Sequence, residues 1–449
     1  MLARNNIILK HFNNFLNYSN KQNINIIYNN NNNFNFNNKP RMHFSTLLNN
    51  NNKNNNNKKN EDEINKFFKD YIYKSSNYSL EQKKKLIESF VLDSQLSDNK
   101  ISKEEIRNIN ISPISSDILE SFIKIRDDLE KYNCQPTTTS TTNTTTNTNR
   151  LGEQLYSFDT LLGELIKENL KSHHRLYCKP LDIEKMEPKI WRQIVDNEAV
   201  HPYENPLNPI DEIKQRTGKN RTCLVLFHPL LPNMPLMSLY IAFTNGIPNN
   251  MQIIENNNND NSSSTSSSAS SSSSLNIDSA IFYSISSLHK GLGGVNLGHI
   301  LITKAVEYIR LDKPEIKNFC TLSPLPRFKK YLSKNHPKFV EHIKDRASLE
   351  EVKPQLQSLA LNYIFKEKSK PNRVFDPVCN FHLKNGASIY RLNWDADESE
   401  KRIDESYGIM INYLYEIDKL DSNSKNYIEK GIVSTNQIFD NQYKNNRFL

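Results

Sequence analysis

Apolar and polar positions follow two different patterns along this 449-residue chain. In residues 61–133, and again from 151 to about 200, apolar residues recur every three or four positions among charged ones, which is the spacing of amphipathic helices. The residues that define the first pattern are Phe67, Tyr71, Leu86, Ile87, Phe90, Leu119, Phe122 and Ile123. The pattern predicts a helical N-terminal domain over residues 61–185, with packing and oligomerisation as its expected role.

From about residue 186 the pattern changes to short runs rich in β-branched and aromatic residues, which predict strands. The runs are CLVLFHP (223–229), LMSLYIAFT (236–244), AIFYSIS (280–286), IKNFCTL (316–322) and ASIYRLNW (387–394). Helical segments alternate with some of them. The sequence therefore predicts an α+β protein, in which the helical domain is followed by a domain built on one mixed sheet over residues 186–449.

Three low-complexity stretches interrupt these patterns and lack the apolar residues needed to form a core. Residues 45–60 are rich in Asn and Lys and predict a linker, whereas the Thr/Asn stretch 137–149 and the Asn/Ser stretch 255–274 predict disordered insertions in surface turns. The five cysteines are scattered and form no CxxC pair, so neither a disulfide framework nor a zinc site is indicated. A reducing compartment fits this cysteine usage best.

The net charge of +8 comes from the N-terminus alone. Eight of the 58 Lys and Arg residues lie in residues 1–60, which contain no Asp or Glu, and the other 50 match the 50 acidic residues of the chain. The body of the protein is thus formally neutral, and no nucleic-acid partner is expected. The chain contains no run of 18 apolar residues, so no membrane span is predicted.

The basic, acid-free N-terminus is typical of a mitochondrial transit peptide. Its apolar residues can share one helix face, and residues 41–46 resemble a processing-peptidase site. The residues of that face are Ile7, Ile8, Leu9, Phe12 and Leu16. We expect residues 1–44 to direct the protein to the mitochondrial matrix. An Asn-rich tail with accidental charge is the alternative, and a peroxisomal or cytosolic pool stays open.

Four of the 11 glycines lie within residues 291–298, in the segment HKGLGGVNLGH. This segment follows the strand predicted at 280–286 and precedes an amphipathic helix. Glycines and the free N–H groups of a helix N-terminus together suit an anion such as a pyrophosphate. Neither a Walker loop nor a Rossmann fingerprint fits the spacing, and a plain strand-to-helix turn is the alternative. Strand, glycine loop, helix and strand is also how GNAT-type folds hold coenzyme A.

Three further segments make a family resemblance specific: EAVHP (198–202), FCTLSPLP (319–326), and PVCNFHLKNGA (377–387) followed by RLNW. Together with residues 279–310 they resemble the malonyl-CoA decarboxylase family, over most of residues 186–415. The resemblance implies a GNAT-like catalytic domain behind a helical oligomerisation domain. It also implies a homo-oligomer, tetramer or dimer, that converts malonyl-CoA into acetyl-CoA and carbon dioxide in fatty-acid metabolism.

The same resemblance assigns site residues. The family's catalytic serine falls on Ser323 and its catalytic histidine on His382. The loop that contacts coenzyme A falls on residues 293–299. The candidates for binding malonyl-CoA are therefore these two residues together with Gly293, Gly294, Val295, Asn296, Leu297, Gly298 and His299.

The chain departs from the family pattern in four places. Thr321 stands where the family usually has a serine, and Gly293 where it usually has a glutamine. The span between Ser323 and His382 is shorter than in animal relatives, which puts the local helices there in doubt. A redox-active cysteine pair is not matched, because His228 and a proline occupy the region beside Cys223, and no disulfide is expected.

The chemistry agrees with these assignments. Loss of carbon dioxide from a malonyl thioester leaves an enolate, and the thioester itself takes up the electron pair, so neither a cofactor nor a metal is expected. The site must hold the carboxylate, stabilise the enolate oxygen and deliver a proton to carbon. Histidine suits proton delivery, so His382 is expected to be the proton donor. Ser323 is its expected partner, which the family labels a proton acceptor.

Other interpretations stay open at this point. A lone serine before proline is more often a turn residue, and a lone histidine at a strand edge is more often a packed side chain. The chain also fits another GNAT-fold enzyme that transfers an acyl group from coenzyme A to an amine, or a non-enzymatic acyl-CoA sensor. Four further residues are candidate hydrogen-bond partners of the site, with a structural role as the default: Asn380, Asn393, Asn412 and Tyr413.

Overall fold

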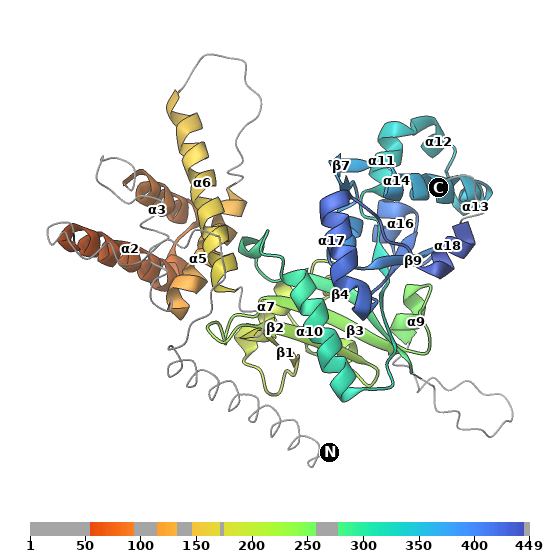
Figure 1. Cartoon of the computed structure of the whole chain (residues 1–449), viewed down its shortest axis with the longest axis horizontal. Helices are drawn as coiled ribbons and strands as arrows, with labels where there is room; N and C mark the ends of the chain where they lie inside the picture. Colours follow the sequence, from red (N-terminus) through yellow and green to blue (C-terminus); the bar gives the residue numbers. More distant parts are fainter. Residues whose placement is uncertain (1–53, 94–114, 133–145, 171–174, 257–276, 444–449) are drawn as a thin grey trace, which may run out of the picture. The chain divides into compact units, whose positions relative to one another are not determined.

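The computed structural model (Figure 1) describes residues 54–93, 115–132, 146–170, 175–256 and 277–443. The predicted transit peptide and most of the two predicted insertions lie outside these ranges. The predicted domain division and the linker therefore stay predictions, although two helices begin inside the low-complexity stretches. The helix α2 starts at Asn54 and α6 at Thr146, since extending a formed helix by one residue costs far less than starting it.

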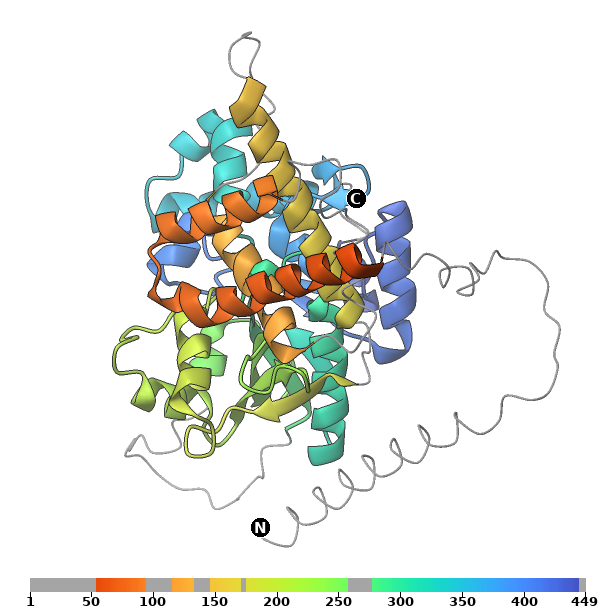
Figure 2. The ribbon, with the colours of Figure 1, turned by 90° about the vertical axis from the view of Figure 1, so that its left-hand side faces the viewer.

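The N-terminal helices bury the residues that the helical spacing selected. They are α2 (Asn54–Lys74), α3 (Leu80–Asp93), α5 (Ser116–Lys131) and α6 (Thr146–Asn169), coloured red to yellow in Figures 1 and 2. Tyr71 and Phe122 are fully buried, and the Phe67 ring stacks on Phe90 with 3.8 Å between centroids. The buried Tyr71 hydroxyl donates a hydrogen bond to Asp128 of α5 at 2.7 Å. The helical prediction for this region is confirmed.

One eight-stranded mixed sheet follows, with the order β1-β2-β3-β4-β5-β10-β6 and with β9 also paired to β10. Its strands are β1 (Tyr177–Pro180), β2 (Arg221–Phe227), β3 (Met237–Thr244), β4 (Ser279–Ser287), β5 (Asn318–Thr321), β6 (Ser323–Pro324), β9 (Ser388–Asn393) and β10 (Met410–Leu414). The predicted α+β class is thus confirmed. The sequence analysis missed β1, β6 and β10, and β1 places the start of the sheet before residue 186.

The pairing of β4 with β5 is parallel, whereas the other pairs in this sheet are antiparallel. The parallel register ends at Phe282 opposite Thr321. In β4 the pairing with β3 jumps from Phe282 to Ser284, so Tyr283 is a bulged residue that opposes no partner. Beyond this point the two strands separate, so that β4 continues into the glycine loop and β5 into the segment that begins with Ser323.

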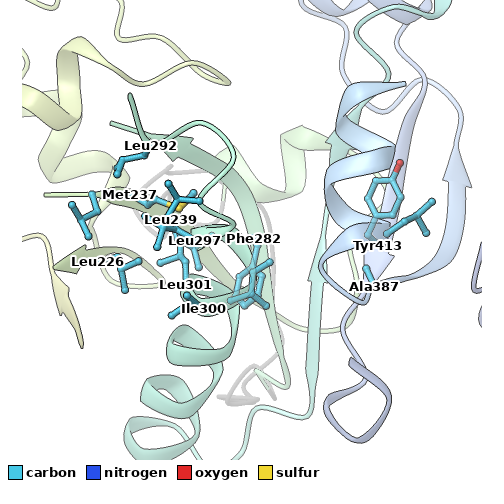
Figure 3. Packing of buried hydrophobic residues seen from close by; sticks show 14 of the residues in the cluster. Leu226, Met237, Leu239, Phe282, Leu292, Leu297, Ile300, Leu301, Ala387 and Tyr413 are labelled. Carbon is cyan, nitrogen blue, oxygen red and sulfur yellow. The ribbon is translucent and has the colours of Figure 1, made fainter. Parts of the chain in front are cut away.

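Each face of the sheet has its own apolar core. On one face lie α7 (Pro188–Asp196), α8 (Ile210–Arg216) and α9 (Met251–Asn256), which pack with residues such as Ile281. On the other face lies α10 (Leu297–Asp312), which presents Leu297, Ile300 and Leu301 to the strands (Figure 3). The predicted amphipathic helix after the glycine loop is confirmed.

The region after β5 contains mainly helices. They are α11 (Phe328–Asn335), α12 (Pro337–Glu341), α13 (Arg346–Glu351), α14 (Lys353–Phe365), α15 (Pro377–Lys384), α16 (Glu400–Ser406), α17 (Leu420–Lys430) and α18 (Gln437–Tyr443), with a two-stranded sheet of β7 (Lys368–Lys370) and β8 (Arg373–Val374). The short span between Ser323 and His382 therefore still holds α11 to α14. In the part of the chain that the structure describes, no helix is both long and apolar enough to cross a bilayer.

Candidate active site

Ser323 lies just past the end of β5, at the sheet edge to which β4 also leads. It opens the short strand β6 and pairs with Ile411 of β10. The residue is buried, and its hydroxyl donates a hydrogen bond to Thr321 Oγ1 at 2.9 Å. Thr321 Oγ1 also accepts from the backbone N–H of Tyr413 at 3.2 Å. The threonine that departs from the family motif thus keeps a hydroxyl beside the serine.

His382 lies on the helix α15, so its assignment to a strand edge was wrong. The helix starts at Pro377, and the side chain of Asp376 before it accepts hydrogen bonds from the N–H groups of Val378 and Cys379. An aspartate cap followed by proline is a strong helix start, and this signal is present in the sequence. Burial raises the pKa of Asp376 to about 6, against the lowering effect of these hydrogen bonds.

A chain of buried hydrogen bonds joins the two candidate catalytic residues. Ser323 Oγ lies 3.0 Å from His382 Nε2, and His382 Nδ1 lies 2.8 Å from the Tyr415 hydroxyl. The imidazole also stacks on the Tyr413 ring, with 4.5 Å between centroids. Residues 59 positions apart in the sequence therefore meet in one site, as the family resemblance implied.

Burial determines the protonation states of the side chains in this hydrogen-bond chain. It lowers the pKa of His382 to about 3 and raises the pKa of Tyr415 well above its ordinary value, so the imidazole and the phenol are both neutral near pH 7. Ser323 has one hydrogen, which it donates to Thr321. This pattern requires a hydrogen on Nε2 of His382 pointing at Ser323, and leaves Nδ1 to accept from Tyr415.

The glycine loop lies at the N-terminus of α10. Gly294 has φ of 82°, a conformation that glycine adopts without strain, and Asn296 has φ of 62° just before the helix. Asn296 makes no side-chain cap, which leaves the first-turn N–H groups of α10 available. A cavity of about 360 Å³ opens there, and its lining includes Val295, Asn296, Leu297 and His299 of the predicted loop together with Lys167 and Lys384.

Helix α5 of the N-terminal region forms hydrogen bonds with this loop through two of its side chains. Asp127 accepts a hydrogen bond from the Gly291 N–H at 2.6 Å, and its second oxygen lies 3.2 Å from His289 Nδ1. Arg126 donates to the carbonyl groups of Gly291 and Gly293 and is itself paired with Asp159. The helical region therefore does more than pack on itself, since it fixes the backbone of the predicted binding loop.

Gly298 brings the loop and the histidine together. A Cβ atom at this position would lie 2.7 Å from the Phe381 ring and 2.9 Å from Asn385 Nδ2. The first turn of α10 therefore packs directly on α15, which carries His382. Four residues of the predicted loop line the cavity, Gly298 lies in this contact, and Ser323 and His382 lie in the hydrogen-bond chain. The predicted residues Gly293 and Gly294 are not part of the cavity lining.

The candidate asparagines near the site have structural partners, whereas the buried Tyr413 hydroxyl has no hydrogen-bond partner among the described residues. Asn412 donates to the Thr321 carbonyl at 2.7 Å and accepts from Asn393, while Asn380 accepts from Tyr427. The sequence analysis missed Tyr415. The signal for it was the run IMINYLY at 409–415, in which Tyr413 and Tyr415 fall on the same face at strand spacing.

Comparison with known proteins gives one consistent result. Residues 176–447 match the family described as malonyl-CoA decarboxylase C-terminal domain. The mitochondrial malonyl-CoA decarboxylases of Anser anser anser and Mus musculus are each 31% identical over 300 residues, which covers 58% of this chain and 57% and 58% of theirs. The chain thus spans a little over half the length of these curated relatives.

Solved structures agree on the fold. The malonyl-CoA decarboxylase of Agrobacterium vitis has a TM-score of 0.64 at 23% identity and covers 86% of this chain and 98% of its own. That of Rhodopseudomonas palustris has a TM-score of 0.59 at 24% identity, with 78% and 84% covered. The helical region followed by a mixed-sheet domain is therefore an arrangement that these structures share.

We predict that Gly298→Ala destabilises the protein by about 1–3 kcal/mol, because the added methyl group overpacks the contact with Phe381. Phe381→Leu in the same chain should recover part of the loss. Urea unfolding measures both. Gly152→Ala is the matched control, since no atom lies within 4 Å of its Cβ position and alanine favours the helix α6. Equal stability of Gly298→Ala and the parent would contradict the close approach.

We predict that His382 makes stability depend on pH. An unfolded histidine takes up its proton near pH 6.5, but folded His382 does so only near 3, so its contribution is complete above about pH 6.5 and is lost as the pH falls towards 3. Relative to His382→Gln, the wild type should lose about 1.4 kcal/mol per pH unit in this window.

Urea unfolding at pH 7.5 and 5.5 tests this prediction. Buried His201 and His228, whose pKa values are also lowered, respond in the same direction but are present in both proteins. The exposed His342→Gln variant is the control and should track the wild type. A stability difference between wild type and His382→Gln that does not change with pH would show that the imidazole is not held neutral by burial.

Proposed function

This chain belongs to the malonyl-CoA decarboxylase family, and on that premise we propose that it converts malonyl-CoA into acetyl-CoA and carbon dioxide. The observation that carries the proposal is the buried chain from Ser323 through His382 to Tyr415, with links of 3.0 and 2.8 Å.

In the proposed reaction the bond between the carboxylate and the α-carbon breaks, and carbon dioxide leaves. The electron pair of that bond passes into the thioester, which becomes an enolate. One proton then adds to the α-carbon and completes acetyl-CoA. A buried site favours the first step, because a charged carboxylate becomes a neutral gas molecule while the two side chains that face it are nearly free of water.

His382 is the proposed proton donor, acting from its neutral form. A cationic imidazole would pair with the substrate carboxylate and stabilise the ground state, whereas a neutral one leaves that carboxylate free to depart. The hydrogen on Nε2 points into the site, and the Tyr415 hydroxyl supports the negative charge that its transfer leaves on the ring. A neutral imidazole also acts as an electrophile in triosephosphate isomerase, where the helix N-terminus lowers its pKa.

Ser323 is the proposed partner of His382. Its hydroxyl is within hydrogen-bonding distance of both Thr321 and Nε2, so it can turn from Thr321 to donate to a substrate oxygen. That donation would stabilise the developing enolate or orient the carboxylate. Thr321 would then accept the hydrogen bond from Ser323 in the free protein, and this bond would break when Ser323 turns to the substrate.

The cavity at the α10 N-terminus is the proposed site for the phosphates of coenzyme A. Lys167 and Lys384 both line it, and the free N–H groups of the first helical turn add further donors. Burial and the neighbouring cations Arg373 and Lys167 lower the pKa of Lys384, which is the effect expected where positive charges gather without an anion. Residues 293–299 would contact the cofactor portion of the substrate.

We predict that His382→Asn lowers kcat for release of acetyl-CoA from malonyl-CoA by at least about 100-fold, with little change in KM, because proton transfer is lost and binding is kept. Ser323→Ala should also lower kcat, and Tyr415→Phe should lower it by about tenfold through loss of one supporting hydrogen bond. Exposed His342→Asn is the matched control and should keep full activity.

The same assay separates the alternatives. It uses malonyl-CoA as the sole substrate and follows acetyl-CoA by chromatography. A folded preparation that binds coenzyme A but releases no acetyl-CoA would refute the decarboxylase proposal. Turnover only after addition of an amine would favour the acyltransferase, and full activity of His382→Asn would remove the proton-donor role.

We propose further that residues 1–44, within the acid-free stretch 1–60, direct the protein to mitochondria, as the names of its curated relatives suggest for those proteins. These residues are basic and acid-free but lie almost entirely outside the described part of the chain. A fusion of residues 1–60 to a fluorescent protein should colocalise with a mitochondrial marker. The same fusion with Arg4 and Lys10 changed to Glu is the control and should stay cytosolic. A diffuse signal from the parent fusion would remove the proposal.

A further inference from the structure

A second and larger cavity, of about 730 Å³, lies apart from the candidate active site. It is lined by side chains of α8, α9, β2 and β4, on the face of the sheet that α7, α8 and α9 cover. Neither Ser323 nor His382 lines it, and it shares no residue with the cavity at the α10 N-terminus. Its chemistry is therefore not accounted for by the proposed reaction.

Three polar groups that line this cavity have no hydrogen-bond partner. They are Nε of Arg221, the hydroxyl of Tyr283 and Nε2 of His201. Arg221 is 8% exposed and Tyr283 6% exposed, so both side chains are buried where they line the cavity. An unmet buried donor carries most of its desolvation cost, and two such donors facing one cavity point to an occupant that accepts from both.

Arg221 is also a buried cation, which the Glu255 carboxylate attracts from beyond ion-pair distance. Its Nη2 atom donates to the backbone carbonyl groups of Ile254 and Glu255, which fixes the guanidinium at the wall of the cavity. No ion pair found among the described residues includes Arg221. By contrast Arg216, the other arginine of the cavity, is paired with Glu212 and lies over the Tyr203 ring at 4.1 Å. One arginine is thus neutralised by the protein and the other is not.

Tyr283 is placed for this role by the bulge in β4. The bulge leaves Tyr283 without an opposing residue on β3, and its side chain joins the face that carries the cavity. Burial lowers the pKa of Arg221 and the adjacent Tyr283 hydroxyl opposes this effect, so the two groups lie close together. Burial lowers the pKa of His201 to about 3, so His201 adds a neutral imidazole.

We propose that this cavity binds a small carboxylate, whose oxygens accept hydrogen bonds from Nε of Arg221 and from the Tyr283 hydroxyl. The exposed residues Glu204, Asp211 and Glu255 line the same cavity and give its outer part a negative charge. A ligand with a positively charged far end, such as an amino acid, is therefore favoured over a simple monoanion, and a dicarboxylate is disfavoured. The site is independent of the proposed decarboxylase activity.

Binding to the full-length protein tests the proposal, measured by ligand-observed NMR titration with three probes of equal chain length. β-Alanine should bind most tightly, propionate more weakly and malonate least. Tyr283→Phe should weaken β-alanine binding about tenfold, because it removes one charge-assisted hydrogen bond. The variant removes only an unpartnered hydroxyl, so it should fold like the parent.

Matched controls separate this site from other causes. Tyr443→Phe removes another buried, unpartnered hydroxyl that does not line the cavity, and it should leave β-alanine binding unchanged. His382→Asn should also bind β-alanine normally, whether or not the chain proves to be a decarboxylase. Absence of β-alanine binding, equal binding by Tyr283→Phe, tightest binding of malonate, or loss of binding in His382→Asn would each overturn the proposal.

Discussion

The parallel pairing of β4 with β5 is the constraint on which the candidate site depends. Parallel strands end at the same edge of a sheet, so the glycine loop that follows β4 and the serine that follows β5 leave the sheet on the same side. The antiparallel strand β10 then closes against both β5 and β6 and adds Tyr413 and Tyr415. Binding loop, serine and supporting tyrosines are thus consequences of one strand arrangement.

The histidine reaches this edge by a different route, through helix packing. The Asp376 cap fixes where α15 begins, and the absence of a side chain at Gly298 lets α10 approach the ring of Phe381. One helix carries the proposed cofactor loop at its start and the other carries His382. A change in their contact would therefore shift the glycine loop and His382 relative to each other, because closely packed helices transmit strain.

Burial of polar side chains is the second constraint, and it has opposite consequences at His382 and at Arg221. At His382 it removes water from a neutral hydrogen-bond chain that joins Ser323, His382 and Tyr415. At Arg221 it removes water from a cation whose remaining donor has no acceptor. The first arrangement joins its side chains by hydrogen bonds, whereas the second leaves buried donors without an acceptor among the described residues. The N-terminal helices also contribute to the candidate active site, because Arg126 and Asp127 of α5 form hydrogen bonds with the backbone of the glycine loop.

The amino-acid sequence by itself determined the fold class, most strands of the sheet and the family. Those features depend on local spacing, on glycines that permit a tight loop, and on motifs whose residues lie close together. It also placed the candidate residues 293–299, Ser323 and His382, but only through the resemblance, because no local pattern links positions 59 apart. What only the tertiary structure decided are the contacts made across elements: Tyr415 on His382, Asp127 under the loop, and Arg221 beside Tyr283. Each joins side chains from different strands or helices, and their distances and burial arise only when those elements pack.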